Sequence, residues 1–254
     1  MNIIVNETHY IGKNLIIFKS LTSTNDYAKE LISKSTPKNG SVILTEEQTA
    51  GRGQAGNEWH AEPNQNITCS IILDTSTLEV NQQFILNMLV AIAVRQTIHE
   101  FIADKDSSFC IKWPNDIMVN SKKIAGILIE NSIQGNYLQY SILGIGINVN
   151  QQAFSKEIQA TSISLENNLE MDMIEIFKKL LLNIENVYAN IYNKDYIQQE
   201  YLKHLFWKDE LKTFHYNNEI ISAKIVGIND FGQLLLQYNN DIIPINNKEI
   251  KYII

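Results

Sequence analysis

The sequence predicts an α+β protein with a large helix-and-sheet unit followed by a small β-rich unit. Three observations predict this: short apolar runs bounded by turn residues, long segments with apolar residues at helical spacing, and a final stretch that contains only short strands. The chain has 254 residues, which suits one large domain plus a small one. We therefore expect helices packed on a sheet, with a second sheet at the end of the chain.

The first part of the chain predicts strands on both sides of a helix. The apolar run Asn14–Phe18 predicts a strand, and Ser20–Asp26 offers several N-cap residues before helical spacing at Tyr27–Ile32. Two further strands are expected, at Ser41–Thr45 and Ile67–Leu73.

The middle of the chain predicts one long helix and two hairpins. Apolar residues at helical spacing favour a partly buried helix over Asn81–Ala103. A small hairpin is expected to turn at Asn120-Ser121. A larger one pairs Ile124–Ile129 with Tyr137–Val149.

The last third changes character near residue 208. Met171–Tyr192 and Asp195–Phe206 are helical in pattern. Short strands separated by asparagine-rich turns then predict a small β-barrel or sandwich. Those strands are Thr213–Phe214, Ile220–Ile228, Gln233–Tyr238 and Ile242–Ile245. We expect a boundary between domains 1–207 and 208–254.

Composition excludes several classes of protein. The chain carries 21 Lys and Arg against 28 Asp and Glu, a formal charge of −7, and only two of its basic residues are arginines. Such a chain is a poor candidate for binding nucleic acid over a long surface. We see no stretch of about 18 uncharged apolar residues and no signal peptide, so we expect a cytoplasmic protein without a membrane partner.

The first candidate for chemistry is the glycine-rich segment Gln48–Trp59. Three glycines within six positions allow successive N–H groups to face an anion, and Arg52 adds a fork of donors at its centre. The segment matches neither the common phosphate loop nor the dinucleotide fingerprint. Glycine content alone favours a mobile surface loop. One of the two arginines and one of the three tryptophans of the chain fall inside this segment, which strengthens the case for a binding loop.

The second candidate is Lys112–Asp116 with the strand that follows. Pro114 favours an extended Trp113, and Asn115-Asp116 then makes a turn whose side chains can face a ligand or a divalent cation. Period two in the next strand lets Lys123 point into a cleft while its neighbours fill the core. A hairpin with solvated lysines is the plainer alternative.

The third candidate is the strand Gly144–Asn150, whose glycines permit the close approach of a backbone or a flat ligand. Together with Ser23-Thr24-Asn25, Gln48–Trp59, Lys112–Asp116 and Lys122–Glu130, it resembles the biotin protein ligase family in order and approximate spacing. The resemblance covers nearly the whole chain. It implies a mixed, mostly antiparallel sheet flanked by helices, like class II aminoacyl-tRNA synthetases and biotin ligases, with a C-terminal SH3-like β-barrel.

The resemblance also implies a function. Biotin would be activated by ATP to biotinyl-5′-AMP and then joined to a lysine of a biotin carboxyl carrier domain, with Mg²⁺ as the accompanying ion and no prosthetic group. Because the chain begins at the catalytic domain, it resembles the single-function form that lacks a DNA-binding domain. We expect no nucleic-acid partner, and a homodimer is left open.

Site residues are carried over from the resemblance by position. Catalysis is expected from Arg52, Lys123 and Asp116, with Asp116 nearest Mg²⁺. Biotin or its adenylate is expected to contact Ser23, Thr24, Asn25, Gln48, Arg52, Gly53, Gln54 and Lys123. The nucleotide is expected to contact Trp59, Lys112, Asn115, Asp116 and Asn148.

The sequence departs from the family pattern at two positions of the loop. Many members have a second arginine where this chain has Gln54, and a basic residue where it has Asn57. An amide can still donate to a phosphate oxygen, so we keep Gln54 as a binding position.

Two other functions compete with this interpretation. A lipoate or octanoate ligase would share the fold, but Trp113-Pro114 and Gly51-Arg52-Gly53 match the biotin branch. A non-catalytic biotin sensor is disfavoured because Arg52 and Lys123 are both retained.

Overall fold

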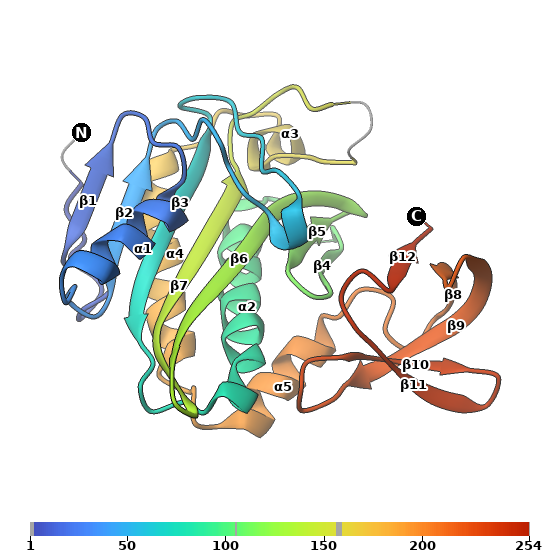
Figure 1. Ribbon diagram of the computed structural model, residues 1–254. Coiled ribbons are helices and arrows are strands. Elements are labelled where there is room, and N and C mark those ends of the chain that lie inside the picture. Colours follow the sequence, from blue (N-terminus) through green and yellow to red (C-terminus); the bar gives the residue numbers. More distant parts are fainter. Residues whose placement is uncertain (1–2, 105, 156–158, 254) are drawn as a thin grey trace.

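A mixed sheet of seven strands forms the larger unit of the protein (Figure 1). The structure is a computed structural model and describes residues 3–104, 106–155 and 159–253. The strand order is β1-β2-β3-β7-β6-β5-β4, in which only β1 and β2 run parallel. The strands are β1 (Leu15–Phe18), β2 (Ser41–Thr45), β3 (Asn66–Asp74), β4 (Phe109–Lys112), β5 (Asp116–Val119), β6 (Lys122–Gln134) and β7 (Tyr137–Asn148). The predicted mixed, mostly antiparallel sheet is confirmed.

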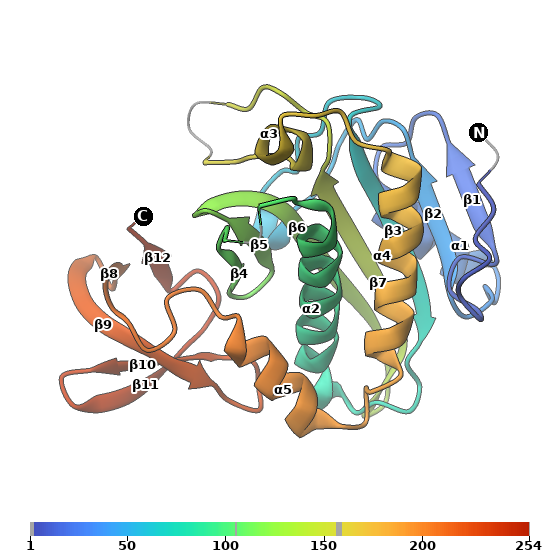
Figure 2. The same cartoon turned by 180° about the vertical axis from the view of Figure 1, so that it is seen from behind.

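Helices cover both faces of this sheet. α1 (Thr24–Lys34) lies on one face, and α2 (Phe84–Phe101) and α4 (Met173–Tyr188) lie on the other (Figures 1 and 2). The start of α1 follows from its sequence, because Ser23 Oγ accepts a hydrogen bond from the N–H of Asp26 and caps the first turn. The remaining helical segments are α3 (Ile163–Asn167), α5 (Lys194–Lys203) and the 3₁₀ turns η1 (Gln54–Gly56) and η2 (Val80–Gln82).

The two faces bury separate sets of apolar side chains. A small cluster under α1 consists of Ala28, Ile43, Ile72 and Ile142. The main core lies on the side of α2 and α4. Because both faces are covered, β2 is buried along its whole length and β3 along all of it except Asp74. These buried strands form a rigid support for the loops that line the site.

The most apolar helix belongs to this core. In the described part of the chain, Val80–Phe101 is long and apolar enough to cross a membrane by length and composition. Most of it is buried inside the protein, which is typical of the core helix of a soluble protein.

The C-terminal unit is a second, antiparallel sheet in the order β11-β10-β9-β8-β12. Its strands are β8 (Leu211–Tyr216), β9 (Glu219–Ile228), β10 (Leu234–Tyr238), β11 (Asp241–Ile245) and β12 (Ile250–Tyr252). Within the described residues the strand pairing leaves β11 and β12 as edges, so the sheet is not closed into a barrel. The β-rich unit with an SH3-like arrangement is otherwise as predicted.

The C-terminal unit is fixed against the larger one beside the β4–β5 turn. Trp113 Nε1 donates to the carbonyl oxygen of Gly232 at 2.9 Å, and the Trp113 residue is only 6% exposed. Aromatic rings of the connecting segment and the second sheet pack on each other, at Phe206, Trp207, Phe214 and Tyr252. These contacts bring the end of the chain close to the first sheet.

The carboxylate of Glu185 in α4 ties down the N-terminal segment. It is 7% exposed and accepts hydrogen bonds from the N–H groups of His9, Tyr10 and Ile11 at 2.6, 3.0 and 2.9 Å. Burial raises the pKa of Glu185, but the three donors outweigh it and lower the pKa below its ordinary 4.5. The ionised carboxylate therefore stabilises the fold.

We predict that Glu185→Gln lowers the free energy of unfolding by about 2 kcal/mol at pH 7. Because the folded-state pKa is the lower one, the contribution is fully present above pH 4.5 and is lost as the pH falls through the folded-state value. Urea unfolding of both proteins across this range should show the two stabilities converging in acid. Glu175→Gln, at an exposed position of the same helix, is the control, and an equal loss there would contradict the assignment.

Candidate functional site

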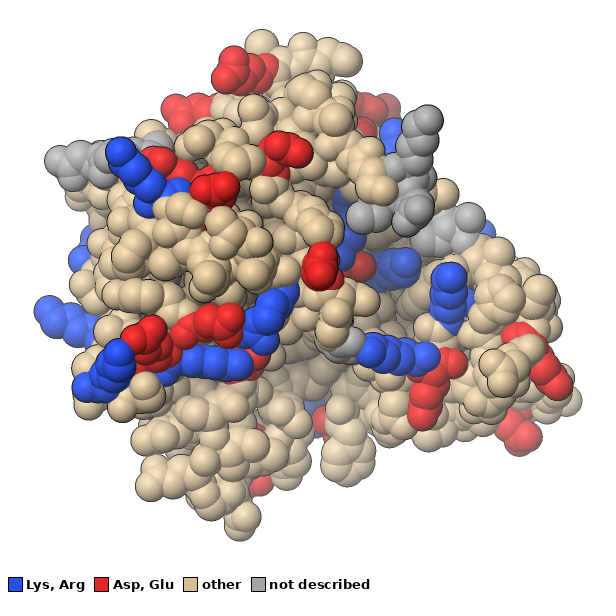
Figure 3. All heavy atoms as spheres, turned by 45° about the horizontal axis from the view of Figure 1, so that its top comes forward, with Lys and Arg blue, Asp and Glu red and all other residues tan. Residues whose placement is uncertain are grey.

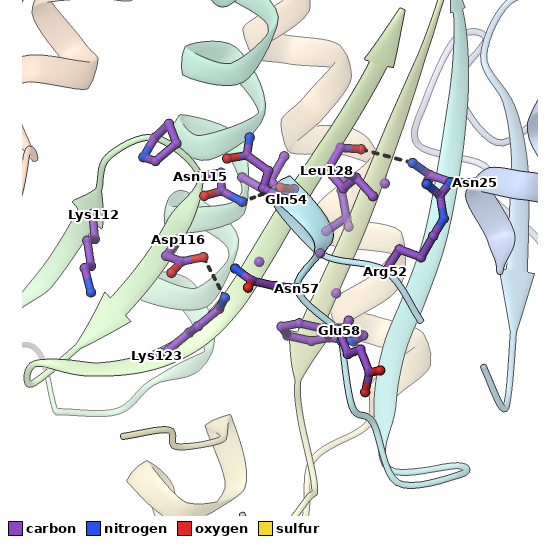
Figure 4. Close-up of a pocket in the computed structure, with 18 of the residues that line it drawn as sticks. Asn25, Arg52, Gln54, Asn57, Glu58, Lys112, Asn115, Asp116, Lys123 and Leu128 are labelled. Atoms are coloured by element: carbon purple, nitrogen blue, oxygen red, sulfur yellow. Dashed lines mark hydrogen bonds and ion pairs between the residues drawn. The ribbon is translucent and has the colours of Figure 1, made fainter. Parts of the chain in front are cut away.

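A cavity of about 360 Å³ lies between the α1 side of the first sheet and the C-terminal sheet. Its walls come from the start of α1, the loop after β2, the β4–β5 turn, the central glycines of β6 and β7, and β12. Basic side chains gather around the hollow between the two units (Figure 3). Figure 4 shows Asn25 and Arg52 at one end of the cavity and Lys112, Asp116 and Lys123 at the other.

Buried polar side chains form the end of the cavity at α1. Ser23, Thr24 and Asn25 are each 3% exposed. Gln48 Oε1 accepts hydrogen bonds from the Thr24 N–H at 2.9 Å and from Thr24 Oγ1 at 3.2 Å. The hydroxyl of Ser70 in β3 lies 2.7 Å from Thr24 Oγ1. This end thus offers fixed hydroxyl and amide groups on an otherwise apolar sheet.

The amide of Asn25 is held in one orientation. Its Nδ2 donates to the Leu128 carbonyl oxygen at 3.2 Å and to Glu130 Oε2 at 2.8 Å, and its Oδ1 accepts from Ser70 Oγ at 2.6 Å. The side chain fits only because residue 144 is glycine. A Cβ atom at Gly144 would lie 2.4 Å from Asn25 Oδ1 and 2.9 Å from the Leu128 carbonyl oxygen. The glycine that the sequence suggested for close approach therefore makes room for Asn25.

Arg52 is paired with two carboxylates. Its Nη1 and Nη2 donate to the two oxygens of Glu130 at 3.2 and 2.9 Å, and Nη2 also contacts Asp26 Oδ1 at 2.6 Å. Burial lowers the pKa of Arg52, but the hydrogen bonds and charges of Glu130 and Asp26 outweigh it and raise the pKa. The guanidinium is a permanent cation at the mouth of the cavity.

The glycine-rich loop has a defined backbone. A Cβ atom at Gly51 would lie 2.3 Å from the carbonyl oxygen of Trp59, so only glycine fits there. Arg52 pairs with Glu58 as an isolated bridge. Gln54 Oε1 accepts a hydrogen bond from Asn247 Nδ2 of the C-terminal unit at 3.0 Å. The loop therefore bridges the two units over the cavity.

The opposite end of the cavity carries two lysines and one carboxylate. Lys123 Nζ lies 2.7 Å from Asp116 Oδ1 and 5.6 Å from the centre of the Trp59 ring. Lys112 Nζ lies 4.9 Å from the Tyr252 ring. Burial lowers the pKa of Lys112, against the opposing effect of Asp116, and Lys123 lowers it further. The buried ammonium group of Lys112 has lost part of its hydration, and a bound anion would compensate for that loss.

Trp59 forms a flat wall on the central strands. A Cβ atom at Gly146 would lie 2.4 Å from its Cε2 atom, and one at Gly126 would lie 3.0 Å from its Cζ3 atom. The Nε1 atom of Trp59 is buried with no hydrogen-bond partner in the described part of the chain. Asn115 also lines the cavity, and its Nδ2 donates to the Ile127 carbonyl oxygen at 2.7 Å.

The structure brings nearly the whole predicted set together. All the residues carried over by the resemblance line the cavity except one. The exception is Asn148, which lies at the end of β7, is 3% exposed, and donates to the Thr161 carbonyl oxygen at 3.0 Å outside the cavity. Lys123 faces the cavity and Ile124 is fully buried, as the strand period predicted.

Several contributors were not predicted. The C-terminal unit supplies five of the lining residues, Asn247, Lys248, Ile250, Lys251 and Tyr252. Three of them form β12, which is only three residues long and therefore shows no period, and the other two precede it. Asp26 and Glu130 were overlooked because their importance comes from pairing with Arg52, which sequence spacing does not show. Among the described residues, no group of three His, Cys, Asp or Glu side chains could hold a metal ion.

Comparison with known sequences gives two family matches. The model described as Biotin/lipoate A/B protein ligase family matches residues 17–148, and the one described as Biotin protein ligase C terminal domain matches residues 213–250. The chain is 34% identical to the bifunctional ligase/repressor BirA of Bacillus subtilis, covering 96% of this chain and 76% of that protein. It is 28% identical to a biotin--[acetyl-CoA-carboxylase] ligase of Mycobacterium tuberculosis, covering 68% of this chain and 63% of that one.

Comparison with solved structures also finds biotin protein ligases. The biotin protein ligase from Aquifex aeolicus in complex with biotin and ATP is 26% identical and superposes with a TM-score of 0.77, covering 94% of this chain and 98% of that one. The Leishmania major biotin protein ligase in complex with biotinyl-5-AMP, at 21% identity and a TM-score of 0.63, shares the fold.

Proposed function

The chain belongs to the biotin/lipoate A/B protein ligase family and is a biotin protein ligase, and on this premise we propose that its central cavity carries out both half-reactions. In the first, a biotin carboxylate oxygen bonds to the α-phosphorus of ATP and pyrophosphate leaves. In the second, the amine of an acceptor lysine attacks the carbonyl carbon of biotinyl-AMP. AMP leaves, and the amine gives up its proton.

The buried polar end near α1 suits the ureido ring of biotin. Ser23, Thr24, Asn25 and Gln48 present hydroxyl and amide groups in fixed orientations, and a ureido group needs both donors and acceptors. Apolar side chains of β6 and β7 that line the cavity, Ile127, Leu128 and Ile145, suit the rest of the ring system. We assign these four side chains to biotin.

The two cations suit the anionic reactants. A carboxylate and a triphosphate repel each other, so the site must hold both and stabilise the charge of the transition state. Arg52, with the Gly53 backbone and Gln54 beside it, lies at one end, and Lys123 lies at the other (Figure 4). We assign Arg52 and Lys123 to the reacting carboxylate and α-phosphate.

The nucleotide is assigned to the other side of the cavity, where Trp59, Lys112, Asn115 and Asp116 lie. The flat face of Trp59 suits an adenine ring, and Lys112 suits a phosphate. Asn148 is left out of this set because its amide faces Thr161. Asp116 is a single carboxylate, which is what Mg²⁺ needs when the substrate phosphates supply its other oxygen ligands. We propose that Asp116 holds Mg²⁺, directly or through water.

The proposal extends to the acceptor and the organisation of the chain. We propose that the acceptor is a lysine on a biotin carboxyl carrier domain, in line with the relative named for acetyl-CoA carboxylase. We also propose that the chain divides into domains 1–207 and 208–254 and that its location is cytoplasmic. Lys251 of β12 and Lys248 just before it line the cavity, and they are compatible with contact to either the nucleotide or the carrier.

One observation carries the proposal. Arg52 and Lys123 lie at opposite ends of a single cavity, and the same cavity contains the buried polar groups that suit biotin. Pyrophosphate release with ATP and either biotin or lipoate tests it. With ATP present, biotin should support pyrophosphate release and lipoate should not. Release with lipoate but not biotin would favour a lipoate ligase, and binding of biotin with no release would favour a sensor.

A further inference from the structure

Glu130 of β6 contacts both α1 and the glycine-rich loop at the end of the cavity assigned to biotin. Its two oxygens accept hydrogen bonds from Asn25 and Lys29 of α1 and from both terminal nitrogens of Arg52 on the loop. The side chain is 19% exposed and does not line the cavity. Whatever it contributes to the reaction must therefore act through the residues that it holds.

An acidic side chain here needs an explanation. Burial raises the pKa of Glu130, but the hydrogen bonds from Lys29, Asn25 and Arg52 outweigh it and lower the pKa, so the carboxylate stays ionised. A negative charge close to two anionic substrates would oppose their binding unless its partners neutralise it. Lys29 and Arg52 supply that neutralisation at 2.6 and 2.9 Å.

The contact with Arg52 also has the geometry that fixes a guanidinium. Both Glu130 oxygens pair with the two terminal nitrogens, and such two-point pairing sets the plane of the group as well as its position. Arg52 stands in a glycine-rich loop, whose backbone and side chain lose much conformational freedom when they are ordered. A rigid strand that holds the guanidinium in advance removes that loss from the binding step.

We propose that Glu130 is a positioning residue for biotin activation, which orients Arg52 for the reacting carboxylate and phosphate without touching either. The proposal rests on the assignment of Arg52 to the reacting anions. Asp26 is the secondary partner of Arg52, on the more exposed side of the guanidinium.

The test is a double-mutant cycle between Glu130→Gln and Arg52→Ala, read as pyrophosphate release at varied biotin and ATP. The amide of Glu130→Gln still offers one oxygen to Asn25 but places an NH₂ group against Arg52. We expect Glu130→Gln alone to lower kcat/KM about tenfold or more, and to lower it less than about twofold when Arg52 is already alanine. Glu30→Gln, which removes an exposed ion pair with Lys34 on α1, should leave the rate unchanged.

The outcomes separate the two claims. If the wild-type protein releases no pyrophosphate, the proposed function is wrong. If Arg52→Ala keeps full activity, the role of Arg52 is wrong. If Arg52→Ala is impaired but Glu130→Gln retains its full effect in that background, or has no effect alone, the positioning role is wrong. Should Glu130→Gln melt below the assay temperature, the same cycle with Asp26→Asn and Arg52→Ala decides, with a smaller expected loss of about threefold that must also vanish in the Arg52→Ala background.

Discussion

Replacement of Lys123 by alanine is expected to lower the rate of biotinyl-adenylate formation by about 100-fold or more while the protein stays folded. Lys123 faces the cavity, and its Nζ lies 2.7 Å from Asp116 and over the Trp59 ring at 5.6 Å. A bound anion would share this cation with Asp116. The fold should tolerate the loss because the side chain is 29% exposed and lies near the start of β6.

Pyrophosphate release at saturating biotin and ATP measures this effect. Lys122→Ala is the matched control, since the neighbouring lysine on the same strand is exposed and outside the cavity wall. A near-normal rate in Lys123→Ala, or an equal loss in both variants, would remove Lys123 from the reaction. Circular dichroism of both variants checks that the fold is intact.

Substitution of Gly144 by alanine is expected to raise the KM for biotin about 10- to 100-fold. The added Cβ would meet Asn25 Oδ1 at 2.4 Å and the Leu128 carbonyl oxygen at 2.9 Å. The second of these is backbone in a central strand and cannot move aside cheaply, so Asn25 must leave its position. The loss should therefore appear in biotin binding, with a smaller change in the KM for ATP.

Titration calorimetry with biotin and steady-state kinetics with each substrate measure the two effects. Gly227→Ala in β9 is the control, because a Cβ there meets only Leu235 Cδ1 at 4.0 Å. Unchanged biotin affinity in Gly144→Ala would show that Asn25 does not bind biotin. An equal loss of ATP affinity would place the damage in the sheet as a whole.

Much of this site could be predicted from the sequence because its residues sit on elements with strong local signals. The N-cap at Ser23 has a local physical cause and appears where expected. Lys123 and Ile124 take opposite sides as expected, but a register shift in the pairing with β5 interrupts the alternation, so that Ile124 and Ala125 are both buried. The glycines at positions 51 and 144 were informative for another reason: a Cβ atom would lie 2.3 Å from the Trp59 carbonyl oxygen at the first and 2.4 Å from Asn25 Oδ1 at the second.

The features that the sequence did not indicate depend on tertiary contacts. Asn148 follows two glycines on a strand that lines the cavity, yet it turns to Thr161 on a different segment. Gln54 meets Asn247 across 193 residues of sequence, and no local pattern indicates such a pair. The short strands β4 and β12 carry too few residues for a period, and their pairing partners define them.

The most direct measurement is incorporation of labelled biotin into a recombinant biotin carboxyl carrier domain, with ATP, Mg²⁺ and the purified chain, followed by mass spectrometry of the product. The account predicts one added biotin on a single lysine, no addition when that lysine is replaced by arginine, and an approximately 100-fold slower reaction with Lys123→Ala. Attachment of lipoate in preference to biotin, or no transfer by a protein that binds biotin and ATP, would contradict it.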